Sequence, residues 1–140
     1  MIKKDLSKMD GRMLNDAKKS MEYARIVYEE LDDDQEHGVA LYLNGGFELI
    51  KYKVISSGYQ DATSFDPKII FRHALLCGAA KIVLFHNHNV NAPPRPSKED
   101  KSCTDTLVKG GKILNIHVVD HIILARGGWY SFKNNNKMGG

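Results

Sequence analysis

Two histidines one residue apart, His86 and His88, stand at the end of the apolar run "KIVLFH", which predicts a buried strand. Side chains two positions apart on a strand point to the same face, so both imidazoles can reach one point. Asp100 lies in the first turn of the next expected helix, from which its carboxylate can turn back toward the strand end. Two histidines and a carboxylate are a common ligand set for a catalytic zinc. A polar surface loop is the alternative, because histidines also end strands without metals.

Two further residues can complete a catalytic site. Ser97 lies three positions before Asp100, near enough to touch the same point, and Glu36 precedes the first expected strand. If that strand neighbours the one carrying His86, Glu36 can act as general base and then as proton donor. Each residue also has a structural interpretation. Ser97 can simply cap a helix, worth ~1 kcal/mol, and Glu36 can be the last member of a solvated acidic run.

The remaining histidines are weaker candidates for a role in the site. His117 and His121 flank "VVD" on an expected strand with the same parity, so we expect them to share a face. Asp120 with His121 is the better pair, and we interpret it as support for the core strand. His37 and His73 complete the set.

The elements that must position these groups begin with a long helix. Apolar residues recur at steps of three and four and predict a helix of about six turns, ended by an acid cluster. We interpret this stripe as core rather than a dimer surface; its members are Leu14, Ala17, Met21, Ala24, Tyr28 and Leu31. "GVALYLN" then predicts a strand, "NGG" a hairpin turn and "FELIKYKVISSG" the partner strand.

The second half predicts two helices and three strands. Asp66 is expected to cap a helix that starts at Pro67 and stops at Gly78. After the central strand "KIVLFH", Ser97 and Asp100 form a variant capping box for a helix that runs to the Gly110–Gly111 pair or slightly beyond. "IHVVDHIILA" and "WYSF" are the last strands, joined by a turn at "RGG". Trp129 and Tyr130 are expected to cover an edge of the core. The order predicts an α/β fold, a single mixed β-sheet flanked by helices.

Composition narrows the class of protein. A chain of 140 residues with 42% hydrophobic and 26% charged residues is typical of one soluble globular domain. The net charge of +3 is too small to require a nucleic-acid partner. No stretch approaches a signal peptide or a membrane span, so we expect a cytoplasmic protein without a membrane partner. Cys77 and Cys103 are expected to be free, mostly buried thiols.

The order of these motifs resembles a known family. "FHNH", then "PSKED", then "TDTLVKGGKILNIHVVDHIIL" look like the RadC-like branch of the JAB/MPN domains, and "QEHGVALYLN" and "FDPKIIFRHALLCGAAKIVLFHNH" match as well. The resemblance covers residues 35–132. It implies a JAB/MPN, cytidine-deaminase-like architecture there. We expect an N-terminal helix in residues 1–34, packing on or preceding this core, and a disordered tail in residues 133–140.

The resemblance also implies a JAMM metal site. His86, His88 and Asp100 become the implied zinc ligands, Glu36 the acid/base, and Ser97 the group that hydrogen-bonds the reacting carbonyl or its oxyanion. The implied activity is zinc-dependent hydrolysis of peptide or isopeptide amide bonds by a metal-bound water, on an unidentified protein substrate.

The alternative is a DNA-repair-associated or non-catalytic binding or scaffold module. Four lysines, at 98, 101, 109 and 112, fall on one side of a helix and could make a weak nucleic-acid contact, although a solvated face explains them as well. The oligomeric state stays open.

The chain departs from the family in three places, the first of them within the usual family pattern "HNHPSGDPTPSRED". The loop of residues 89–96 reads "NVNAPPRP" and is one residue longer, which we expect to alter the rim of the site and its substrate fit. "DPKII" stands where the family usually has a glutamate. About 30 residues precede the expected core, room for one helix rather than the helix-hairpin-helix region of full-length relatives.

Overall fold

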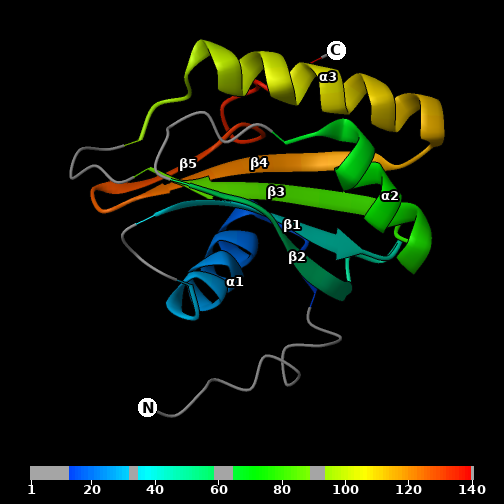
Figure 1. Cartoon of the computed structure of the whole chain (residues 1–140), viewed down its shortest axis with the longest axis horizontal. Helices are drawn as coiled ribbons and strands as arrows, with labels where there is room; N and C mark the ends of the chain where they lie inside the picture. Colours follow the sequence, from blue (N-terminus) through cyan, green and yellow to red (C-terminus); the bar gives the residue numbers. More distant parts are fainter. Residues whose placement is uncertain (1–12, 32–34, 59–64, 89–93, 140) are drawn as a thin grey trace.

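The chain folds as a sheet with helices on both faces, and the order of elements is the one that the sequence predicts (Figure 1). The structure is a computed structural model that describes residues 13–31, 35–58, 65–88 and 94–139. The expected changes in the loop of residues 89–96 therefore lie largely outside the described residues. The elements are α1 (Ala17–Glu29), β1 (Glu36–Leu43), β2 (Leu49–Gly58), α2 (Pro67–Cys77), β3 (Lys81–Asn87), α3 (Lys98–Leu114), β4 (His117–Ala125) and β5 (Gly128–Ser131).

The five strands form one mixed sheet in the order β2-β1-β3-β4-β5. β3 is the central strand, parallel to β4 and antiparallel to β1, and the other neighbours pair antiparallel. Both faces of β3 are covered, with α1 on one side and α2 and α3 on the other (Figure 1). This explains why its sequence is nearly all apolar and confirms the predicted single mixed sheet.

Alternate residues of the strands supply two separate cores. On the α1 side, Val39, Leu41 and Phe85 pack in one cluster, and on the opposite side Ala40 and Leu84 pack in the other. Apart from Ala17, which is also buried, the predicted apolar stripe belongs to the α1-side cluster or packs against it, so it is core. At the sheet edge, Trp129 packs against the same cluster, as expected. Cys77 and Cys103 are free and half-buried.

α1 is shorter than the sequence predicts, with 13 residues rather than about six turns. The Asp16 carboxylate accepts a hydrogen bond of 2.7 Å from the Lys19 amide and so caps the helix at Ala17. Leu14 stands before the cap, where its amide donates to the Phe47 carbonyl and its side chain is 1% exposed. Leu14 is therefore a core residue without being helical.

An extra residue in β4 changes which side chains share a face. Ile82 pairs with Val118 and Val83 with Asp120, so β4 advances two residues against one on β3. Val118 consequently packs in the α2/α3-side core, whereas Val119 packs on the α1 side. The prediction that His117 and His121 share a face is wrong, because this bulge interrupts the alternation between them.

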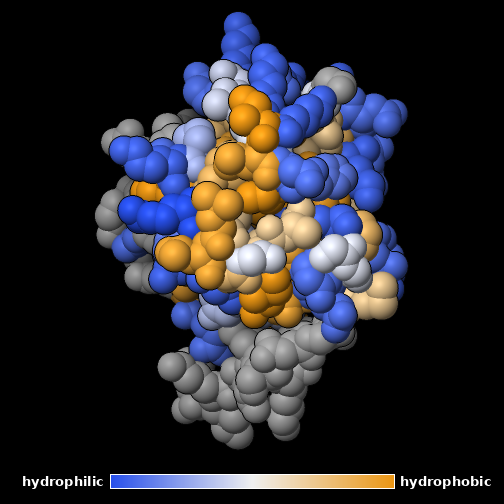
Figure 2. Space-filling model, turned by 90° about the vertical axis from the view of Figure 1, so that its right-hand side faces the viewer, coloured by the Kyte–Doolittle hydropathy of each residue, from blue (hydrophilic) through white to orange (hydrophobic). Residues whose placement is uncertain are grey.

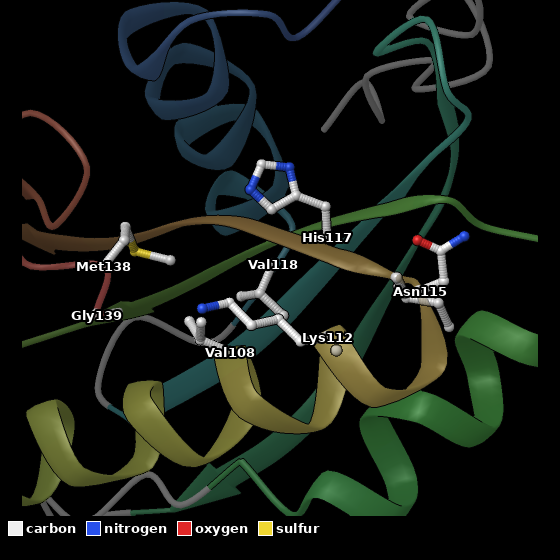
Figure 3. A pocket seen from close by; sticks show the side chains of 9 residues that line it. Val108, Lys112, Asn115, His117, Val118, Met138 and Gly139 are labelled. Atoms are coloured by element: carbon white, nitrogen blue, oxygen red, sulfur yellow. The ribbon is translucent and has the colours of Figure 1, made fainter.

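The start of β4 also borders a groove of about 430 Å³ (Figure 3). Lys112, His117 and Met138 line it, and His117 points away from α3 while Val118 points toward it. Residues 132–136 form turns, and Met138 packs partly buried against the core. The disordered tail expected for residues 133–140 stays a prediction. The groove lies at the N-terminal end of β3 and β4, away from His86.

The same end of the molecule carries an apolar surface (Figure 2). Four large side chains with exposed fractions of 43–84% lie at the C-terminal ends of α2 and α3: Leu75, Leu76, Ile113 and Leu114. Among the described residues, no helix combines the length and apolar character that crossing a membrane requires.

Candidate metal site

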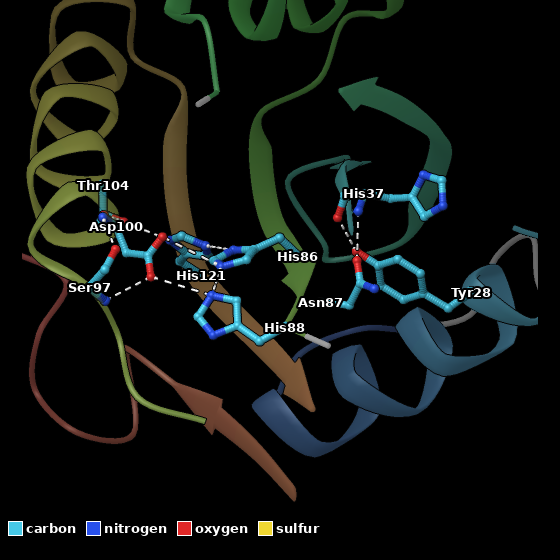
Figure 4. A network of polar contacts seen from close by, with 9 residues as sticks. All are labelled: Tyr28, His37, His86, Asn87, His88, Ser97, Asp100, Thr104 and His121. Carbon is cyan, nitrogen blue, oxygen red and sulfur yellow. Dashed lines mark hydrogen bonds and ion pairs between the residues drawn. The ribbon is translucent and has the colours of Figure 1, made fainter. Parts of the chain in front are cut away.

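The C-terminal end of β3 and the first turn of α3 bring three potential ligands together (Figure 4). The Nε2 atoms of His86 and His88 lie 2.8 Å apart, which confirms that the two imidazoles reach one point. Asp100 approaches both, with Oδ1 3.5 Å from Nε2 of His86 and Oδ2 3.8 Å from Nε2 of His88. His86 is fully buried and 16% of the His88 side chain is exposed, so the site opens to solvent on the His88 side.

Asp100 owes its position to the predicted capping box. Its amide donates to Ser97 Oγ at 3.0 Å, and the Ser97 amide donates to Asp100 Oδ2 at 2.8 Å. A carboxylate is also favourable at this helix N-terminus. Ser97 is therefore a helix cap that orients Asp100, and a hydroxyl that accepts one bond can still donate its hydrogen.

Glu36 lies on the strand next to the two histidines. β1 and β3 are antiparallel neighbours, and Gly38 pairs directly with His86. Residues two positions apart share a face of the strand, so Glu36 projects to the same face as His86, toward the end where His88 follows. Its exposed fraction is 8%. The condition for the predicted role of Glu36, that its strand neighbours the histidine strand, is met.

Asn87, between the two histidines, bonds the backbone around Glu36. Its Oδ1 accepts from the His37 amide at 2.7 Å, and its Nδ2 donates to the Gln35 carbonyl at 3.1 Å. The Tyr28 hydroxyl of α1 donates to the His37 carbonyl (Figure 4). The Asn87 side chain thus continues the contact of β3 with β1 beyond the last backbone pair. Our sequence reasoning missed this residue.

His121 also lies against the candidate ligands. Its Nε2 is 2.8 Å from Nδ1 of His86, and its Nδ1 is 2.7 Å from Thr104 Oγ1. The sequence predicts core support for His121, whereas the bulge in β4 turns its ring toward His86. Thr104 was missed, although its place four residues after Asp100 puts both on one face of α3. The ring of Phe65 packs edge-on against both His86 and His121.

The expected pair of Asp120 with His121 does not form between side chains. The Asp120 carboxylate accepts from the His121 amide, from the Lys133 amide and from the Ser131 hydroxyl. It therefore ties β4 to β5 and the turn that follows. Two of the remaining histidines also lie outside the site. His37 lies near the ring of Tyr28, and His117 lines the groove at the far end of β4.

Burial sets the charge of the inner histidines. It lowers the pKa of His86 to about 4, although Asp100 opposes the shift and His88 adds to it. The pKa of His121 lies well below its ordinary value, first because the ring is buried and then because His86 and His88 are close. Both rings are therefore neutral at pH 7, which is the form that binds a metal.

The donor set fits a metal ion. Ligand atoms from His86, His88 and Asp100 all lie within 4.8 Å of one another. Two imidazole nitrogens and a carboxylate oxygen suit zinc, whose ligands at about 2.0–2.1 Å stand roughly 3.3 Å apart in a tetrahedron. The separations here, 2.8, 3.5 and 3.8 Å, bracket that value, so small side-chain adjustments suffice.

Comparison with known proteins agrees with this geometry. Residues 14–138 match the model of the RadC-like JAB domain. The chain is similar to the UPF0758 protein of Methanococcoides burtonii, with 40% identity over 124 residues, 85% of this chain and 54% of that protein. A UPF0758 protein of Methanosarcina acetivorans is 36% identical over 112 residues, 80% of this chain and 48% of the relative. The chain spans about half the length of the curated relatives it matches.

Proposed function

Because the chain belongs to the RadC-like JAB domain family, we propose that it is a zinc-dependent hydrolase of peptide or isopeptide amide bonds. One observation carries the proposal. Two imidazoles at a strand end and a carboxylate at a helix start converge within 4.8 Å, on the sheet face toward which Glu36 projects.

Three residues would hold the metal. His86 and His88 offer their Nε2 atoms, and Asp100 offers Oδ1, because its Oδ2 accepts the Ser97 amide hydrogen. Zinc in such a site supplies Lewis acidity, which polarises a carbonyl and acidifies water. The enclosed side of the site, around His86, keeps the three donors close together without bulk water. The open side, at His88, admits the substrate.

Glu36 is proposed as the general base. From the strand beside the histidines it takes a proton from the attacking water and then returns a proton to the leaving nitrogen. Asn87 holds the backbone on both sides of Glu36, which keeps the carboxylate in reach of the reacting atoms. The two steps need one group that changes protonation state twice, and a carboxylate does this.

Ser97 is proposed to donate its hydroxyl hydrogen to the oxyanion that forms on the substrate. One such donor is typically worth ~3 kcal/mol in the transition state. Its cap role is compatible with this, because the cap uses the oxygen as an acceptor from the Asp100 amide.

Metal content tests the ligand assignment. Zinc bound by the purified parent protein is compared with zinc bound by His86→Ala, Asp100→Ala and the control His117→Ala, whose histidine lies at the far end of β4. We expect about one zinc per parent chain and per control chain, and loss of zinc in the two ligand variants. Equal zinc in all four proteins would refute the site.

Hydrolysis tests the activity itself. The probes are a fluorescence-quenched peptide library and a peptide branched through a lysine ε-amide bond. We expect cleavage by the zinc-loaded parent and none by zinc-loaded Glu36→Gln. A parent that binds zinc and cleaves neither probe would instead support the non-catalytic binding module.

A further inference from the structure

A chain of hydrogen bonds links two of the proposed ligands through residues that the proposed reaction does not use (Figure 4). It begins at the backbone carbonyl of Asp100, which lies 2.7 Å from Thr104 Oγ1. Thr104 Oγ1 lies 2.7 Å from Nδ1 of His121, and Nε2 of His121 lies 2.8 Å from Nδ1 of His86. All four residues are buried, with exposed fractions of 0–4%.

The chemistry of these groups allows one direction of donation. A carbonyl oxygen only accepts, so the Thr104 hydroxyl must donate its single hydrogen to Asp100. The hydroxyl oxygen then accepts from Nδ1–H of His121. A neutral imidazole carries one N–H, so Nε2 of His121 accepts. The opposite direction would set two acceptor oxygens against each other at 2.7 Å.

The direction of donation at His121 also determines the tautomer of His86. Since Nε2 of His121 accepts, Nδ1 of His86 donates, and Nε2 of His86 keeps its lone pair. That lone pair faces Nε2 of His88 and Oδ1 of Asp100, where the metal would bind. The other His86 tautomer would place a hydrogen on Nε2 and block coordination.

We call the hydrogen-bond chain from Asp100 through Thr104 and His121 to His86 the relay. Ring packing holds its His121 ring in place. The His121 ring stacks on Phe132 with centroids 4.7 Å apart and planes at 10°. Phe65 packs edge-on against His121, with centroids 5.5 Å apart. His121 is 1% exposed among these rings, and such burial disfavours a charged imidazole, so the ring has one N–H to place. The bulge in β4 is what brings His121 to this face.

We propose that His121 and Thr104 are positioning residues that hold His86 in its Nδ1–H tautomer and thereby strengthen metal binding at Nε2. The inference rests on the proposed metal site. Partners of this kind, one bond behind a ligand, typically change metal affinity by about 10–100-fold.

The first test reads the tautomers directly. Nitrogen-15 NMR of the histidine rings distinguishes Nδ1–H from Nε2–H in the full, metal-free chain. We expect His86 and His121 both as neutral Nδ1–H tautomers. In Thr104→Val, which keeps the shape but removes the acceptor, we expect the Nε2–H form of His121 to appear. Either ring as Nε2–H in the parent would overturn the inference whether or not the protein binds zinc.

The second test measures affinity for zinc alone, by competition with a chromophoric chelator. We expect Thr104→Val to bind zinc about 10–100-fold more weakly than the parent, and Thr104→Ser, which restores the hydroxyl, to recover most of the loss. Thermal unfolding of the metal-free variants checks that both are folded. A folded Thr104→Val with parental affinity would overturn the relay but leave the metal site standing. A parent that binds no zinc would overturn the proposed function and the gain in affinity together, while the tautomers still report on the relay.

Discussion

The Asn87 carboxamide bonds the peptide groups on both sides of Glu36, accepting from the His37 amide and donating to the Gln35 carbonyl. Asn87 stands between the two proposed histidine ligands, so one tripeptide both presents imidazoles and holds the strand of the proposed base. A small movement of β1 relative to β3 would shift the base relative to the ligands. We therefore expect the relation between these strands to determine the proposed activity.

We expect Asn87→Ala to separate metal binding from catalysis. The ligands stay in place, so zinc content should equal that of the parent, whereas kcat should fall by up to ~100-fold because Glu36 is no longer held at its position. Steady-state kinetics on zinc-loaded protein measure this. Asn87→Asp keeps the acceptor for the His37 amide, so its kcat should lie between those of the parent and Asn87→Ala. Unchanged kcat in Asn87→Ala would show that the two hydrogen bonds of the Asn87 side chain do not contribute to catalysis.

The two proposed roles of Ser97 can be separated with two substitutions. Ser97→Ala removes the cap and the hydroxyl, and should lower the free energy of unfolding by ~1 kcal/mol, whereas Ser97→Gly should lower it by only a few tenths. Both variants lose the same donor, so kcat should fall by a similar factor, about 100-fold, in each. Urea unfolding and kinetics check this. If kcat instead falls less in Ser97→Gly than in Ser97→Ala, in parallel with the free energy of unfolding, Ser97 acts only as a helix cap.

Acid should destabilise the metal-free protein through its buried histidines. The pKa of His86 falls from the ordinary 6.5 to about 4, and that of His121 is also lowered. The unfolded chain therefore binds more protons below about pH 6.5, and the free energy of unfolding should fall as pH drops from there to about 4. Urea unfolding with a chelator at several pH values measures this. His121→Phe should show a shallower fall, and an identical slope would contradict the assignment.

The connection from α3 to β4 should tolerate no side chain at Gly111. A Cβ there would lie 2.2 Å from the Ile116 carbonyl oxygen, which is backbone, so Gly111→Ala should cost about 1–3 kcal/mol. At Gly110 the nearest atom is Cε2 of the Phe71 ring, at 3.0 Å, and a ring can move. Gly110→Ala should therefore cost less than Gly111→Ala, since alanine favours the helix by about 1 kcal/mol at both positions. Urea unfolding compares the two variants. Equal losses in the free energy of unfolding would contradict the prediction that only Gly111 lies against fixed backbone.

The sequence by itself determined the local features of the site. Two-residue periodicity put His86 and His88 on one face of β3, and the three-residue step from Ser97 to Asp100 predicted the capping box. Asp66, Pro67 and Gly78 marked the ends of α2 in the same way. These features depend on residues within a few positions of each other, so the types and spacing of residues are enough to predict them.

Tertiary structure decided the rest of the site. His121 faces His86 only because β4 bulges against β3, and parity alone placed it beside His117. Asn87 reaches the backbone around Glu36 because β1 pairs with β3 across about fifty residues of chain. Both relations arise from the pairing of distant strands. A one-residue change of register reverses the face of every later side chain, and no local pattern records where that change occurs.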